Sequence, residues 1–272
     1  ATCWGAGDGE ATPHYGQTSP PGVVFEQVSS GRSHSCGVDE SGALHCWGSD
    51  AHGQSTPPEG VFRMVSAGGH HTCAQQATGT ISCWGVSDGS EEDNGQVTDV
   101  PSGAFVAVSA GHRHSCALDT TGGIQCWGAG TTNTEEDFEY GQSIPPEGVF
   151  VSVYAGFQHS CAREADGMVT CWGNPQEDRT IPPEVAFVQM DLGNSFGCGV
   201  DATNAVHCWG KDLMGETITD ADEDGHDVLA DCQDDDALLT PVDSDGDGLS
   251  TCDGDCDDGD SSVGASDEDG DG

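Results

Sequence analysis

The chain has 272 residues, of which 48 are acidic and 6 are basic, and its formal net charge is -42. This charge excludes the usual phosphate-binding surface, because nucleic-acid binding needs Lys and Arg to replace condensed counterions. It also argues against docking on an anionic membrane, and it makes cations the expected partners. No run of residues is long and apolar enough to insert into a membrane. The 14 cysteines indicate an oxidising compartment, so we expect a secreted, extracellular or cell-surface protein. The 41 glycines and the few helix-forming runs favour an all-β chain.

One unit of about forty residues recurs along the chain. Six Cys-Trp-Gly motifs occur, and their tryptophans are spaced 37 to 45 residues apart: Trp4, Trp47, Trp84, Trp127, Trp172 and Trp209. Between them the same features follow in one order: Gly-Gln, a proline turn, a Phe, a Val-Ser-Ala-Gly-like strand end and a stretch with two cysteines. Tandem units of this length with several short strands match the blades of a propeller.

The first full unit predicts three strands. Residues 25–29 alternate as a half-buried strand does, and the proline turn before them fixes the entry. The glycine that follows indicates a tight bend or a close backbone approach. Residues 34–38 and 43–47 are predicted as a hairpin closed by turn residues 39–42.

The two cysteines of each hairpin are ten residues apart with the turn midway, so they face each other across antiparallel strands. A non-hydrogen-bonded pair brings Cα atoms to about 4.5 Å, within reach of a disulfide. The predicted bridges are Cys36–Cys46, Cys73–Cys83, Cys116–Cys126, Cys161–Cys171 and Cys198–Cys208.

The order Gly-Gln, Pro-Pro, Phe, Val-Ser-Ala-Gly, His-Ser-Cys-Ala-Leu, Gly, Cys-Trp-Gly resembles the regulator-of-chromosome-condensation repeat family in a secreted, disulfide-bearing form. The resemblance implies a β-propeller of about five to seven four-stranded blades over residues 1–218. The namesake nuclear exchange activity and chromatin binding are not carried over, because disulfides do not suit the nucleus and the acidity does not suit chromatin.

Several repeated residues invite functional interpretations. The loops 87–93 and 131–139 are acidic; we interpret them as solvated loops, with a partner-binding rim as the alternative. A histidine precedes the first hairpin cysteine by two residues at His34, His71, His114 and His159, but the fifth copy has Phe196. That exchange favours packing and hydrogen bonding over a ring of metal ligands. The tryptophans are expected in the core between blades.

The acidic segment 219–272 carries a second repeat, Asp-x-Asp-x-Asp-Gly or a close variant, beginning at Asp220, Asp243 and Asp267. Alternating carboxylates followed by glycine form the first half of a calcium loop, but no full EF-hand with flanking helices follows. The segment resembles thrombospondin type 3 repeats and the bacterial aspartate-rich putative metal-binding motif, in a loop-rich calcium-binding arrangement. A disordered, solvated tail is the alternative, and copper or manganese are weaker candidates than calcium. The predicted ligands are Asp220, Asp222, Asp224, His226, Asp231, Asp243, Asp245, Asp247, Leu249 (through its carbonyl), Asp255, Asp257, Asp258, Asp260, Asp267, Asp269 and Asp271.

The ends of the chain leave open questions. Cys3 has no partner in the repeat, and Cys232, Cys252 and Cys256 lie outside it; Cys3–Cys232 with Cys252–Cys256 is one arrangement. The chain opens without a signal peptide and within a blade, so we expect either a trimmed chain or a blade completed by another subunit.

No nucleophile elbow, zinc-protease motif or phosphate loop occurs, and we predict a protein that is not an enzyme. The leading hypothesis is a calcium-stabilised, disulfide-linked structural protein of the cell exterior that self-associates head to tail into a fibre. The alternative is a secreted module or inhibitor that binds another extracellular protein through the loops of one propeller face.

Overall fold

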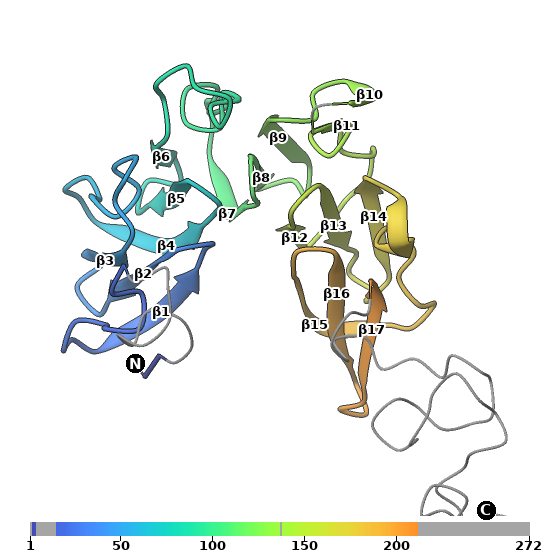
Figure 1. The fold of residues 1–272 in the computed structure, drawn as a ribbon. Helices are drawn as coiled ribbons and strands as arrows, with labels where there is room; N and C mark the ends of the chain where they lie inside the picture. The colour runs from blue at the N-terminus through green and yellow to red at the C-terminus, as the bar shows by residue number, and fades with distance from the viewer. Residues whose placement is uncertain (1, 4–14, 137, 212–272) are drawn as a thin grey trace, which may run out of the picture.

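The computed structural model describes residues 2–3, 15–136 and 138–211. These residues are all-β apart from one 3-10 turn, η1 (Gln176–Asp178). Five three-stranded antiparallel sheets follow one another along the chain, and a two-stranded hairpin lies between the third and the fourth. In Figure 1 the sheets lie side by side in chain order, from β1–β3 in blue to β15–β17 in orange.

Each sheet is one repeat, with its strands paired in sequence order. The first sheet contains β1 (Phe25–Ser30), β2 (His34–Asp39) and β3 (Leu44–Gly48). The remaining strands are β4 (Phe62–Ala67), β5 (His71–Gln76), β6 (Ile81–Gly85), β7 (Phe105–Ala110), β8 (His114–Asp119), β9 (Ile124–Gly128), β10 (Asn133–Glu136), β11 (Glu139–Tyr140), β12 (Ser152–Ala155), β13 (His159–Arg163), β14 (Val169–Gly173), β15 (Phe187–Leu192), β16 (Phe196–Asp201) and β17 (Val206–Gly210). The three strands predicted for the first unit are therefore confirmed.

The blades differ from the prediction in strand number: each of the five repeat sheets has three described strands, not four. The segment that would supply a fourth strand contains the Gly-Gln motif and the proline turn. Proline lacks the N–H that a ladder needs, and Gly53 adopts a φ of 78° that extended strands do not use. This segment therefore forms turns between the sheets, as at residues 51–55.

The core lies between the sheets. In each of four clusters, the first hairpin cysteine of one sheet packs against the Phe and the Val or Met of the next. At the first boundary, Cys36 and Val38 meet Phe62 and Val65. The tryptophans Trp84, Trp127, Trp172 and Trp209 join these clusters, which confirms that they belong to the core between blades. We call the Phe and Trp side of a sheet its leading face, and the opposite side its disulfide face.

All five predicted disulfides are present. Cys36 and Cys46 are directly opposite in the register of β2 and β3, with Cα atoms 4.0 Å apart. Backbone geometry explains why the third residue of each Cys-Trp-Gly motif is glycine. Gly48 has a φ of 102°, and a Cβ placed on it would lie 2.7 Å from His34 Cα, so a larger residue would be strained and crowded.

Candidate functional site

A cavity of about 640 Å³ lies where the inner strands of all five sheets end. Its walls come from the residue that ends each of β1, β4, β7, β12 and β15 and from the turns that follow. We call these the glycine turns, because each opens on a glycine: 31–33, 68–70, 111–113, 156–158 and 193–195. The end of the molecule that carries them is here called the pocket face.

The glycines bring neighbouring backbones into direct contact around the cavity. A Cβ on Gly68 would lie 2.4 Å from the carbonyl oxygen of Gly111, and one on Gly111 the same distance from that of Gly156. The next residue in the turn bonds across the boundary, as His112 N donates to Gly156 O at 3.0 Å. The prediction of close backbone approach at this glycine is thereby confirmed, and no side chain could replace it without moving the next sheet.

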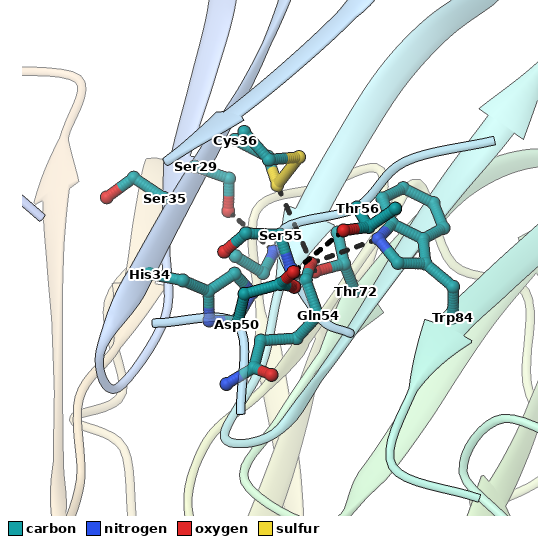
Figure 2. Close-up of a disulfide and its surroundings, with 12 residues drawn as sticks. Ser29, His34, Ser35, Cys36, Asp50, Gln54, Ser55, Thr56, Thr72 and Trp84 are labelled. Carbon is teal, nitrogen blue, oxygen red and sulfur yellow. Dashed lines mark hydrogen bonds between the residues drawn. A yellow bond between two sulfur atoms is a disulfide. The ribbon is translucent and has the colours of Figure 1, made fainter. Parts of the chain in front are cut away.

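Beneath the glycines, a repeated hydrogen-bond network joins the sheets. His34 Nε2 is 2.7 Å from Thr72 Oγ1, and Thr72 donates in turn to the carbonyl of Gln54. Trp84 Nε1 donates to the same carbonyl at 3.0 Å. Figure 2 shows these groups converging beside the disulfide at Cys36. The backbone carbonyl of the glutamine in each Gly-Gln motif thus accepts a hydrogen bond from the Trp of the following hairpin.

The four repeated histidines are fully buried, with exposures of 0–1%. Burial lowers the pKa of His34 to about 4 and the pKa values of His71, His114 and His159 to about 3. Three of them bond to a Ser or Thr hydroxyl of the next sheet. The interpretation of these residues as packing and hydrogen-bonding groups is therefore confirmed for His34, His71 and His114.

At the mouth of the cavity the side chains differ from one repeat to the next. The positions after the turn glycine are Arg32-Ser33, Gly69-His70, His112-Arg113, Phe157-Gln158 and Asn194-Ser195. Two of the chain's six Lys and Arg residues, Arg32 and Arg113, therefore lie on one small surface of a strongly acidic protein. Sequence reasoning missed this cluster. The signal that could have revealed it is the variation at the two positions after the turn glycine, within an otherwise repeated motif.

The charged and imidazole groups of the mouth contact one another. Arg32 Nη1 lies 3.3 Å from His70 Nε2 and 3.5 Å from His112 Nε2. Burial lowers the pKa of both imidazoles, that of His112 to about 4. The neighbouring arginines lower both pKa values further, and Glu92 offsets part of the shift at His70. The two rings are therefore neutral near pH 7 and can accept hydrogen bonds from Arg32.

Two long loops complete the mouth, at the same end of the array in Figure 1. From the first, Glu92 Oε2 pairs with Arg113 Nη2 at 2.8 Å, and Glu91 O accepts from Arg113 Nη1. From the second, Phe138 lies under Arg113, whose Cζ is 3.8 Å from the ring centroid. The described parts of these loops are largely exposed, as expected of solvated loops, but each loop also contacts Arg113 of a glycine turn.

The remaining predicted residues are distributed as follows. The ten hairpin cysteines are brought together in pairs within the hairpins. Every proposed calcium ligand, with Cys232, Cys252 and Cys256, lies outside the described residues. The boundary between domains at residue 218 lies there too. Within the described ranges no cluster of three or more His, Cys, Asp or Glu side chains could hold a metal ion. In the same ranges, no helix is long and apolar enough to cross a membrane.

Comparison with known proteins agrees with this geometry. The sequence profile of the regulator of chromosome condensation (RCC1) repeat matches residues 25–54, 105–133 and 150–178. No curated protein matches the sequence.

Three of the solved structures that share the fold illustrate the likeness. The ectodomain of the receptor kinase CR4 from Physcomitrella patens is 24% identical, with a TM-score of 0.55 over 71% of this chain and 53% of that one. The CRINKLY WD40 ectodomain of ACR4 from Arabidopsis thaliana is 24% identical, with a TM-score of 0.54 over 70% and 66% of the two chains. Human WBSCR16 is 15% identical, with a TM-score of 0.56 over 70% and 62%. This chain thus spans between about half and two thirds of their length, and it is an all-β chain of RCC1-type repeats on propeller-like, disulfide-bearing sheets.

Proposed function

We propose that the described sheets form a non-catalytic, extracellular binding module whose partner docks on the pocket face. The observation that supports this is a division of roles within each repeat. The Phe, Trp, Cys and Gly-Gln positions recur and are used in packing between sheets. The two positions after the turn glycine vary, and they place charge and aromatic surface around the cavity. Binding residues on loops held by a rigid scaffold are a common arrangement.

The extracellular setting is supported by the disulfides and by the fold. Five bridges in five repeats persist in oxidising compartments. The two plant structures that share the fold are receptor-kinase ectodomains.

Site-directed crosslinking would test the docking face. A photo-crosslinking amino acid is placed at Ser33, on the pocket face, and in a second protein at Ser41, in the hairpin turn at the opposite end of the sheet. Both proteins are incubated with the extracellular material in which the protein naturally occurs. We expect one defined adduct from position 33 and none from position 41. Adducts of equal yield from both positions, or from neither, would contradict the proposal.

A second candidate function, head-to-tail self-association, is favoured by the two outermost faces of the array. Among the described residues, no sheet covers the leading face of the first sheet, where Val28 is 49% exposed while its counterpart Val65 is 0%. None covers the disulfide face of the fifth sheet either, where Val206 is 50% exposed. These two faces have the same chemistry as the pairs that meet at the four internal boundaries. Docking one on the other would be a heterologous contact, which produces rings or fibres.

We also propose that the segment 219–272 binds calcium through its Asp-x-Asp-x-Asp-Gly loops. The support is chemical: carboxylates at alternate positions and a glycine that permits the chain to reverse. In this proposal calcium stabilises a stalk or linker next to the sheets.

A further inference from the structure

We propose that the cavity mouth binds a peptide segment that presents one carboxylate beside an aromatic side chain, with Arg32 receiving the carboxylate and Phe138 and Phe157 receiving the ring. This inference rests on the proposed binding function and specifies its ligand. The two parts of the ligand follow from two different features of the mouth.

The first feature is the state of Arg32. Its side chain is exposed, and its hydrogen bonds in the described residues go to two neutral imidazoles. The other arginine of the mouth, Arg113, is already paired with Glu92. Because no described carboxylate pairs with the Arg32 guanidinium, it can still form a charge-assisted bond with an incoming anion.

The second feature is an aromatic wall. The rings of His112 and Phe157 have centroids 4.3 Å apart, and Phe138 lies edge-on to Phe157 at 6.1 Å. Phe138 has a φ of 74°, a left-handed backbone conformation that bulky residues rarely adopt. The loop keeps this conformation, and it places the ring against Arg113 and Phe157 at the cavity. An aromatic ligand side chain could stack against these rings.

The surrounding charge limits the ligand to a single anionic group. Glu92 lies 3.8 Å from His70, and Asp88 lies 3.8 Å from His52 at the outer edge of the same row of rings. These carboxylates and the net charge of the whole chain repel polyanions such as nucleic acid. One carboxylate can approach Arg32, but a row of phosphates cannot do so without facing this acidic edge.

The test uses the full chain and short capped peptides. Binding of Ac-Phe-Asp-NH2, Ac-Phe-Asn-NH2 and Ac-Ala-Asp-NH2 is measured by NMR titration of the ring signals of His70, His112 and Phe157. Inorganic phosphate is titrated in parallel. The variants are Arg32→Gln and, as a matched control, Arg63→Gln, which removes an exposed arginine of β4 outside the cavity. Because Arg32 is exposed, its variant should fold normally, and the unfolding midpoint checks this.

We expect Ac-Phe-Asp-NH2 to bind at least tenfold more tightly than either of the other two peptides. Arg32→Gln should remove that tenfold preference over Ac-Phe-Asn-NH2, and Arg63→Gln should keep it. Equal binding of the Asp and Asn peptides, equal loss in the two variants, or phosphate binding as tight as the Asp peptide would overturn the assignment. If crosslinking still identifies the pocket face in that case, only the ligand class is wrong and the docking face stands.

Discussion

His71 Nε2 lies 2.8 Å from Ser115 Oγ, across the boundary between the second and third sheets. The fourth boundary lacks this bond, because the position that carries a hydroxyl in the other sheets is Gly197. His159 Nε2 is consequently buried with no hydrogen-bond partner among the described residues. A side chain at Gly197 has no room, since a Cβ there would lie 2.4 Å from Trp209 Cζ2.

This asymmetry predicts opposite responses to the same substitution. His71→Phe should lower the free energy of unfolding by about 1–3 kcal/mol, because it leaves a buried hydroxyl without its partner. His159→Phe should leave the free energy of unfolding unchanged or raise it. The fifth sheet already carries Phe196 at this position. A Cβ placed on Gly193 would lie 2.6 Å from Phe196 Cε1, and a Cβ placed on Gly156 would lie the same distance from His159 Cε1, so the two rings occupy equivalent places. Urea unfolding of the oxidised proteins measures both, and equal losses would refute the explanation.

The buried histidines also predict acid sensitivity. Their pKa values are about 3 to 4 in the folded protein, below the value of 6.5 for an exposed histidine, so the unfolded chain binds more protons. Stability is therefore complete above pH 6.5 and falls as pH decreases toward the folded values. At pH 5 each histidine should reduce it by roughly 2 kcal/mol.

The window between pH 6.5 and 5 separates this effect from the carboxylates. Hydrogen bonds from Ser41 and His45 lower the pKa of Asp39, whose exposed value is 3.8, so its contribution is lost only at lower pH. Urea midpoints at pH 7.5, 6.0 and 5.0 measure the dependence. His159→Phe removes one titrating group and should give a shallower decline; a midpoint independent of pH in this window would contradict the prediction.

The repeat explains how much of the fold could be predicted. Cys36 and Cys46 could be paired because the same ten-residue step occurs five times, and the strands follow from alternation around it. The number of strands per sheet could not be derived, because it depends on whether the Gly-Gln and proline segment forms a ladder. The mouth of the cavity was hidden for a different reason. Arg32, His112 and Phe138 come from different repeats and a loop, so no local pattern connects them.

The disulfides should differ in their resistance to reduction. Cys73 is 0% exposed at an internal boundary, whereas Cys198 lies half-buried on the disulfide face of the fifth sheet. Thiol attack requires access to the sulfur, so the Cys198–Cys208 bridge should open first. Alkylation and mass spectrometry during a dithiothreitol time course measure the order. Earlier opening of Cys73–Cys83 would show that the fifth sheet is covered in solution.

The free energy of unfolding lost when a disulfide is removed should also differ between the sheets. Each hairpin disulfide closes a short loop and contributes about 2–3 kcal/mol in the chain-entropy description. Replacing Cys73 and Cys83 with alanine should cost more than replacing Cys198 and Cys208, because the Cys73 side chain also fills the second core cluster. Urea unfolding of the two double variants compares them, and equal losses would show that packing of the sulfur adds nothing.

Calcium should bind the acidic segment and leave the sheets unchanged. Titration calorimetry with calcium should give heat that decreases when Asp243, Asp245 and Asp247 are changed together to asparagine, because the central one of the three loops loses three carboxylates. Asp39, Asp119 and Asp201, changed together to asparagine, are the matched control, since they serve hairpin turns. Absence of heat at millimolar calcium, or equal loss in the control, would rule out the predicted site.

Self-association should depend on the two outermost faces. Sedimentation velocity over a range of concentrations should show oligomers of the oxidised chain. Val28→Glu or Val206→Glu should abolish them, because either places an unpaired charge in an apolar contact. Val24→Glu is the control, since Val24 is 71% exposed and precedes β1. A mixture of the two face variants should dimerise, because each retains one intact face and the intact faces are complementary. A wild-type chain that stays monomeric at every concentration, or oligomers that survive both face substitutions, would exclude head-to-tail docking through these surfaces.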